Sequence, residues 1–380
     1  MFATLGRKVL SFSGVEFDLS RACLTGLTFW VVSTGTASAH VKWFCAYNVA
    51  GQPRGLESVL CEDFELLVVL ALLGLYVTSL VECSFLGEGI SRALNVVTGR
   101  LQPYTELMIR SICGFFFVSI WAVGGILLTP ELKSTSPLVS ILHLLIAAGV
   151  LSRRTMPISA VGIGIVFAIA VWNYGLFHLA DYPIFLGIAA YLALTSLQRT
   201  LFGLAPLDVV RYAAGVTLMW ASVEKWAYPE WAFPLFGDHP GLAMGFDREF
   251  YMRAAGVVEF ALAFALIWTP LLRRCAAATL LGFFISACFE FGKIDTIGHS
   301  AIIAILFATL FDNRRIEKDD VTLPLLAPAG FCAALVVVLF IYYAGHAALF
   351  NTVLQAELRQ TTSATGRIDP WLEAGRLNAA

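Results

Sequence analysis

Ionisable side chains lie within or beside strongly apolar segments of this chain. Glu259 is near the middle of the apolar segment 250–271, and Glu224 and Lys225 end the segment before it. A charge at the centre of a bilayer costs about 2.5–3.5 kcal/mol on insertion scales, and such residues usually serve a function. We therefore expect Glu259 to face the interior of a helix bundle, to be protonated or to pair with a cation, in a site for a polar ligand or for proton transfer. Lys225 is the nearest candidate cation and Lys293 is the second. An ion pair that only locks the helices is the structural alternative.

A second group of ionisable residues occupies the stretch FEFGKIDTIGHS, at the turn between two later apolar segments. It contains Glu290, Lys293, Asp295 and His299. Histidine titrates near neutral pH, and burial can raise the pKa of a carboxyl group toward that range. These residue types therefore suit the binding of a polar head group or a relay of protons. We expect them to form the outer lip of a polar pocket whose floor is Glu259, with purely structural pairing again as the alternative.

Aromatic residues gather beside the first group, in the stretch ASVEKWAYPEWAFPLF. They are Trp226, Tyr228, Trp231 and Phe233. Aromatic side chains commonly mark the boundary between membrane and water, so a girdle at that boundary is one interpretation. One wall of a pocket for a flat or apolar ligand is the other.

The composition places all of these residues in a membrane protein. Of the 380 residues, 58% are hydrophobic and 14% are charged, whereas soluble domains are about 45–50% apolar and roughly 25% charged. The net charge of −2 provides no basic surface for nucleic acid. Because roughly 20 apolar residues cross a bilayer, we predict an all-α polytopic protein with about nine or ten transmembrane helices. The predicted spans are residues 64–86, 107–128, 138–151, 157–178, 183–198, 206–227, 250–271, 275–291, 297–311 and 324–350.

The N-terminal segment, residues 1–39, has the order of a signal peptide: basic residues, an apolar stretch and a small-x-small motif ending at Ala39. An uncleaved first transmembrane helix is the alternative. Cleavage would leave His40 with a free amine beside its imidazole, an arrangement that can chelate copper. Residues 40–63 then form an outer loop, where Cys45 and Cys61 can pair in an oxidising compartment. Residues 64–205 form an N-terminal transmembrane region, 324–350 a final helix and 351–380 an outer C-terminal tail.

Basic residues in the short loops predict the orientation, because cytoplasmic loops are enriched in Lys and Arg. With the basic end of the leader inside, alternation of the spans places the more basic loops on the cytoplasmic side. These loops contain Arg92, Arg100, Arg153, Arg154, Arg199, Arg273, Arg274, Arg314, Arg315 and Lys318. We expect a multi-pass protein of a bacterial inner (cytoplasmic) membrane with a periplasmic C-terminus. Its expected partners are the lipid bilayer and other membrane or periplasmic redox subunits.

Residues 206–311 resemble the DoxX/DoxD-like membrane proteins. The matching features are Arg211 near the start of the first helix, the motif EKW containing Lys225, Gly256-x-x-Glu259 in the second helix, and a Pro/Arg turn to a third. The resemblance implies a four-helix membrane bundle and a link to respiratory or redox chemistry. The chain departs from the family in its additional spans before and after this region, and GKIDTIGHS is more polar than the usual fourth helix.

The absence of several motifs narrows the function classes. The sequence contains no GxxxxGK[ST], HExxH or GxSxG motif, so it indicates no P-loop, zinc protease or nucleophile-elbow chemistry. A non-catalytic or accessory subunit is therefore expected. The residues favour a redox-accessory or quinone-interacting protein, in which Lys225, Glu259 and His299 bind a head group or relay protons. A transporter for a small solute or metal, and a structural assembly subunit, are the alternatives.

Overall fold

The computed structural model describes residues 41–243, 245–314 and 324–365. The predicted leader at 1–39, His40 and residues 366–380 of the predicted tail lie outside the described residues. Within the described part the chain is almost wholly helical, with two isolated β-bridges and no strand. The all-α prediction is therefore confirmed.

The helices follow one another with short connections along most of the chain. In chain order they are α2 (Val41–Phe44), α3 (Leu56–Val59), α4 (Glu62–Glu82), α5 (Phe85–Thr98), η1 (Gln102–Tyr104), α6 (Thr105–Val123), α7 (Pro137–Gly149), α8 (Met156–Tyr174), α9 (Leu176–Leu179), α10 (Pro183–Leu197), α11 (Pro206–Ala227), η2 (Pro229–Ala232), α12 (Phe233–Asp238), η3 (Pro240–Ala243), α13 (Arg248–Leu266), α14 (Pro270–Phe311) and α15 (Leu326–Thr365). Proline begins α7, α10, α11 and α14, because its fixed φ suits the first helical position and no hydrogen bond is lost there.

Five helical stretches of the described chain are long and apolar enough to cross a membrane: Glu62–Glu82, Gln102–Val123, Met156–Tyr174, Pro270–Phe311 and Leu326–Phe350. Helices α7 and α10 are apolar but shorter. Helix α11 has the length of a span, but it carries charged residues in its first and last turns. The chain is thus a polytopic membrane protein.

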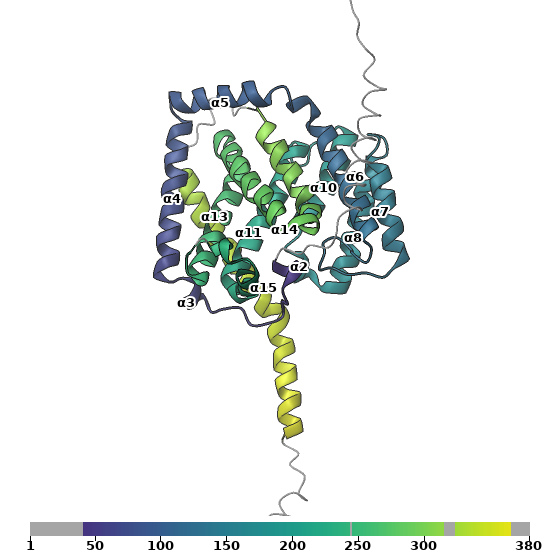
Figure 1. Ribbon diagram of the computed structural model, residues 1–380, viewed down its shortest axis with the longest axis vertical. Helices are drawn as coiled ribbons and strands as arrows, with labels where there is room; N and C mark the ends of the chain where they lie inside the picture. The colour runs from purple at the N-terminus through teal and green to yellow at the C-terminus, as the bar shows by residue number, and fades with distance from the viewer. Residues whose placement is uncertain (1–40, 244, 315–323, 366–380) are drawn as a thin grey trace, which may run out of the picture.

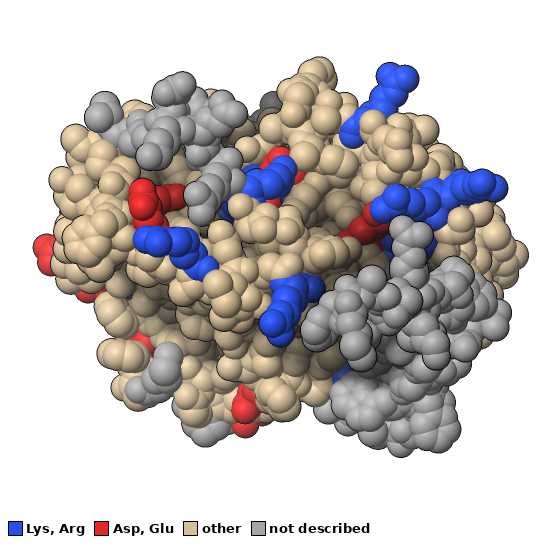
Figure 2. Space-filling model, turned by 90° about the horizontal axis from the view of Figure 1, so that it is seen from above, with Lys and Arg blue, Asp and Glu red and all other residues tan. Residues whose placement is uncertain are grey.

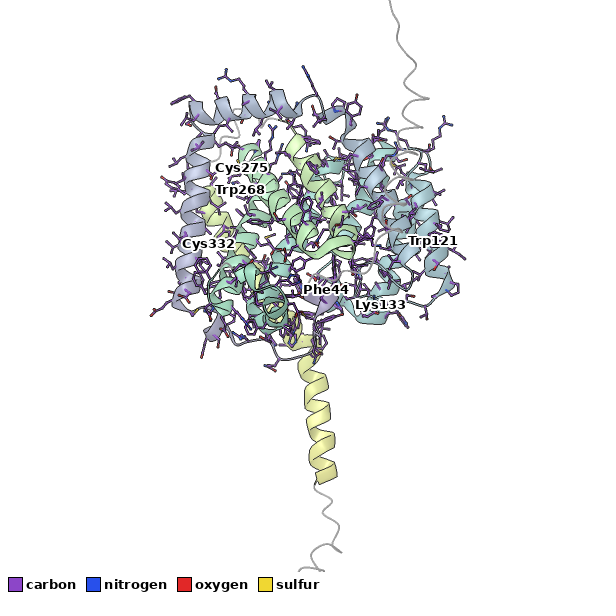
Figure 3. All side chains as sticks on the ribbon, viewed as in Figure 1. Phe44, Trp121, Lys133, Trp268, Cys275 and Cys332 are labelled. Atoms are coloured by element: carbon purple, nitrogen blue, oxygen red, sulfur yellow. The ribbon has the colours of Figure 1, made fainter. Side chains whose placement is uncertain are left out.

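The helices run between two ends of the molecule, named here the α5 end and the α2 end (Figure 1). Helix α5 crosses one end, and α2 and α3 lie at the other. The labelled side chains in Figure 3 follow this division, with Trp268 and Cys275 toward the α5 end and Phe44 and Lys133 toward the α2 end.

The α5 end gathers many of the arginines that the sequence places on one side. Arg153 pairs with Glu106, and Arg273 lies 2.9 Å from Asp312. Figure 2 looks onto this end and shows Lys and Arg side chains spread across it. An ion pair also lies at the α2 end, where Arg54, in the loop that precedes α3, lies 3.0 Å from Glu249 of α13.

Helix α5 was not predicted, because its segment is too short and too polar for a span. It lies across the end of the bundle, with Phe85 79% exposed and Val96 78% exposed. Its other face is tied to α14, since the guanidinium of Arg274 donates hydrogen bonds to Asn95 and Thr98. An amphipathic helix in this position has the features of a helix at the membrane interface.

Helix α14 is a helical hairpin rather than a straight rod. Gly292 interrupts it with φ 77° and ψ −149°, a backbone region that is essentially restricted to glycine. The chain reverses there, so that Arg274 at the start of the first limb donates a hydrogen bond to the carbonyl of Leu310 at the end of the second. The predicted spans 275–291 and 297–311 are the two limbs.

The C-terminal helix is longer than predicted. Helix α15 begins at Leu326 and continues to Thr365, whereas the predicted span ended at residue 350. Its last part extends beyond the other helices at the α2 end (Figure 1). The segment predicted as a tail therefore begins as a continuation of the final helix.

Replacing Gly292 should weaken the hairpin. Gly292→Ala places a Cβ in a glycine-only conformation, so we expect a loss of about 1–3 kcal/mol in stability. Thermal unfolding in detergent measures the change. Gly282→Ala is the matched control, because Gly282 lies in the same helix with open space around the added Cβ. An unchanged melting temperature for Gly292→Ala would contradict the assignment of Gly292 as the required turn.

Candidate functional site

A cavity of about 780 Å³ lies among α4, α11, α13 and α14, beside α2 and the loop before α13. Its volume falls within the range of about 300–1,000 Å³ that is typical of ligand pockets. Most of its wall is aromatic and aliphatic, including Trp231, Phe250 and Phe284. The ionisable residues on the wall are Lys42, Asp181, Glu224, Lys225, Glu259, Glu290 and His299. The structure thus brings together most of the residues singled out from the sequence.

Lys225 and Glu259 form an ion pair across α11 and α13. Lys225 Nζ lies 2.6 Å from Glu259 Oε2, and the two side chains are 25% and 18% exposed. The pairing expected from the sequence is therefore present, and both side chains line the cavity. Partial exposure leaves each charge within reach of a molecule in the cavity.

Lys42 forms a second, deeply buried ionic cluster that the sequence analysis missed. Its Nζ lies 2.9 Å from Asp181 Oδ2 and 2.5 Å from Glu224 Oε2. The lysine side chain is 4% exposed and the two carboxylates are 7% and 11% exposed. Burial by itself lowers the pKa of Lys42, but Asp181 and Glu224 outweigh burial and raise it above its usual value. Lys42 therefore stays charged, and it holds α2 against the turn before α10 and the end of α11.

Trp43 fixes the same short helix against the hairpin of α14. Its ring centroid lies 5.0 Å from that of His299. The ring also lies against Gly298, where an added Cβ would come within 1.9 Å of a Trp43 ring carbon. Glycine is thus required at this position, because any side chain would displace the tryptophan. Helix α2 seals one side of the cavity by these contacts.

Asp295 and His299 form a dyad on the second limb of the hairpin. His299 Nδ1 lies 2.9 Å from Asp295 Oδ2, one helical turn away. Asp295 is 1% exposed and does not line the main cavity, whereas His299 does. A buried carboxylate in this position fixes the orientation of the imidazole ring. Both residues also line a smaller cavity of about 200 Å³, together with Lys225.

The two remaining predicted residues, Glu290 and Lys293, differ in their relation to the cavity. Glu290 lines the cavity and lies 2.7 Å from His239 Nδ1, with the two side chains 50% and 29% exposed. Lys293 is absent from the lining of both cavities. Of the residues expected at the outer lip, Glu290 and His299 line the main cavity, whereas Lys293 and Asp295 do not.

Tyrosines surround a buried histidine next to the Lys42 cluster. The ring of His178 contacts those of Tyr47, Tyr174 and Tyr182, with centroids 5.5, 5.7 and 6.4 Å away. Burial, followed by the charge of Lys42, lowers the pKa of His178 to about 4. His178 is therefore neutral at neutral pH.

The predicted disulfide is not present in the structure, where Cys45 and Cys61 are free thiols. Cys45 follows α2 and lies beside Leu235 of α12. Cys61 precedes α4, in which Asp63 pairs with Arg253 of α13. The two cysteines are thus held by different contacts. The predicted copper ligand His40 lies outside the described residues.

No protein-family model, curated protein or solved structure matches the chain.

Removal of Lys42 should destabilise the protein strongly. Lys42→Met leaves Asp181 and Glu224 buried without their cation, and such a change costs about 3–5 kcal/mol. We expect a large drop in the thermal unfolding midpoint in detergent. The double variant Lys42→Met/Glu224→Gln should recover part of the loss, since one buried charge is removed. A midpoint within error of the wild type for Lys42→Met would contradict the cluster.

Acid should destabilise the protein partly through His178. Its pKa of about 4 in the folded chain is below the value of about 6.5 in an unfolded chain. Between these values the unfolded state binds a proton that the folded state does not, so stability falls as the pH drops from about 6.5 to 4. The unfolding midpoint measured across this range should fall less for His178→Phe. Identical pH profiles for the two proteins would refute this role.

Proposed function

We propose that the cavity binds a lipophilic molecule with a polar head group, and that a quinone is the first candidate. The observation that carries the proposal is the composition of the cavity wall. It is mostly apolar, yet Lys225, Glu259 and His299 all face it. A largely apolar pocket with a few placed polar groups is the usual form of a site for a small organic ligand.

Two exposed residues at the rim of the cavity support the entry of a ligand from the lipid bilayer. Val258 on α13 and Phe283 on the first limb of α14 line the cavity and are 42% and 53% exposed. Helices α13 and α14 follow one another directly at the α5 end, so the opening lies between consecutive helices. In a membrane-embedded bundle such a surface faces acyl chains. A lipid-soluble ligand would therefore enter the cavity laterally from the bilayer, between α13 and α14.

The polar groups suit a head group that carries oxygen atoms. The ammonium of Lys225 and the imidazole of His299 are hydrogen-bond donors for a carbonyl oxygen. Glu259 and His299 can accept or donate a proton when such a group is reduced or oxidised. This combination favours a quinone over a fully apolar lipid.

Exposure separates the ligand-binding charges from the structural ones. The Lys42 cluster is almost completely buried, which favours the structural interpretation for those residues. The Lys225–Glu259 pair is several-fold more exposed on the lysine side and faces the cavity. We therefore assign the head-group role to this second pair, together with His299, and not to the Lys42 cluster.

The proposed setting is a redox-accessory subunit of a bacterial inner membrane. Arg92, Arg100 and Arg199 support a cytoplasmic location for the α5 end, by the enrichment of basic residues in cytoplasmic loops. The cavity and the end of α15 would then face the periplasmic side. The resemblance of residues 206–311 to DoxX/DoxD-like proteins agrees with a redox role.

A titration with a short-tailed quinone tests the proposal. The protein is reconstituted in nanodiscs, and quenching of tryptophan fluorescence is followed, because Trp231 lines the cavity. We expect saturable quenching in the wild type and at least tenfold weaker binding for Lys225→Met and Glu259→Gln, equivalent to about 1.4 kcal/mol.

Two variants serve as controls for the titration. Trp231→Phe should lose much of the quenching signal. Lys133→Met removes an exposed lysine at the same end of the molecule, away from the cavity lining, and should bind as the wild type does (Figure 3). Equal affinity in all variants, or quenching that never saturates, would contradict the proposal.

A further inference from the structure

We propose that Cys288, Asp295 and His299 bind a divalent transition metal, with Zn²⁺ as the best fit. Each residue offers one ligand atom, and these atoms lie within 4.8 Å of one another. This inference is distinct from the binding of a lipophilic ligand, because Cys288 and Asp295 take no part in that proposal and only His299 is common to both.

The turn at Gly292 builds this cluster. Cys288 lies in the last turn of the first limb, and Asp295 and His299 lie one turn apart on the second limb. In a straight helix, residues seven positions apart would be separated by about 10.5 Å along the axis, at a rise of about 1.5 Å per residue. Because the chain reverses at Gly292, the side chains of Cys288 and Asp295 lie close together.

Asp295 has an unused ligand atom. Its Oδ2 accepts a hydrogen bond from His299, but its Oδ1 is buried and has no hydrogen-bond partner among the described residues. Leaving a buried acceptor unsatisfied is costly, and more so for a charged group. A metal ion would supply the missing partner and neutralise a carboxylate that is 1% exposed.

The ligand types indicate the class of metal. Thiolate, imidazole and carboxylate are the ligands that Zn²⁺ uses in proteins. Structural zinc sites have four protein ligands, whereas catalytic sites usually have three and leave the fourth position open to a small molecule. Asp295 and His299 line the smaller cavity, which also contains Lys225. The open position would therefore be reached from this cavity.

Cobalt provides a direct probe of the site. The full-length protein is purified with a tag that does not bind metal, stripped with a chelator and titrated with Co²⁺. We expect one Co²⁺ per chain and a thiolate-to-cobalt absorption band, displaced by an equivalent of Zn²⁺. Cys288→Ser should abolish the band, and Asp295→Asn should weaken binding at least tenfold.

Cys275→Ser is the matched control. Cys275 is an exposed free thiol on the same hairpin, toward the α5 end (Figure 3). This variant should keep the band. Absence of the band in the wild type, its survival in Cys288→Ser, or its loss in Cys275→Ser would overturn the proposal.

X-ray absorption of the zinc-loaded wild-type protein provides a test that needs no variant. One sulfur ligand with nitrogen and oxygen ligands is expected, and a shell without sulfur would overturn the assignment. Repeating the quinone titration with stripped protein separates the two proposals, since the metal site can fail while the cavity still binds its ligand.

Discussion

The burial of Lys42 between Asp181 and Glu224 is the constraint on which the site depends. These residues come from α2, from the turn before α10 and from the end of α11. Removing charges from water costs several kcal/mol for each ion, and only close pairing offsets it. The short helix α2 must therefore dock before the cavity has its final wall. Trp43 is the next residue of the same short helix, and its ring packs against that of His299.

Neighbouring charged residues of the site have different roles. Glu224 and Lys225 are adjacent in sequence but point to different partners, Lys42 and Glu259. Both pairs line the cavity, but the first is almost completely buried and joins helices, whereas the second is more exposed. A similar division applies to the hairpin, where Asp295 is buried and His299 reaches the cavity wall. Asp295 orients the ring of His299 through their hydrogen bond.

Sequence reasoning located the helices well, because apolar segments of membrane length are a local signal. The span predicted at 206–227 coincides with α11, and the expected Lys225–Glu259 pair is formed. Two features were missed for local reasons. The segment of α5 is short and half polar, so it does not look like a span. Gly292 was one glycine in a polar stretch, and its backbone conformation is not visible in the sequence.

The Lys42 cluster was missed because it is a long-range feature. Lys42 and Glu224 are separated by 182 positions, and no local pattern joins them. A weak signal was present, since Asp181 lies in a short loop that contains no basic residue. An isolated carboxylate between two apolar segments needs a partner from elsewhere in the chain. The sequence does not say which cation supplies it, because only packing brings α2 to that loop.

Analysis of the lipid-soluble compounds that copurify with the protein tests the central claim most directly. The protein is extracted from its native membrane, and bound compounds are identified by mass spectrometry, alongside the Lys225→Met/Glu259→Gln double variant prepared in the same way. We expect one class of lipophilic molecule with an oxygen-bearing head group to be enriched with the wild type and depleted from the variant. The same compounds in the same amounts from both proteins would show that the cavity does not select a ligand through Lys225 and Glu259.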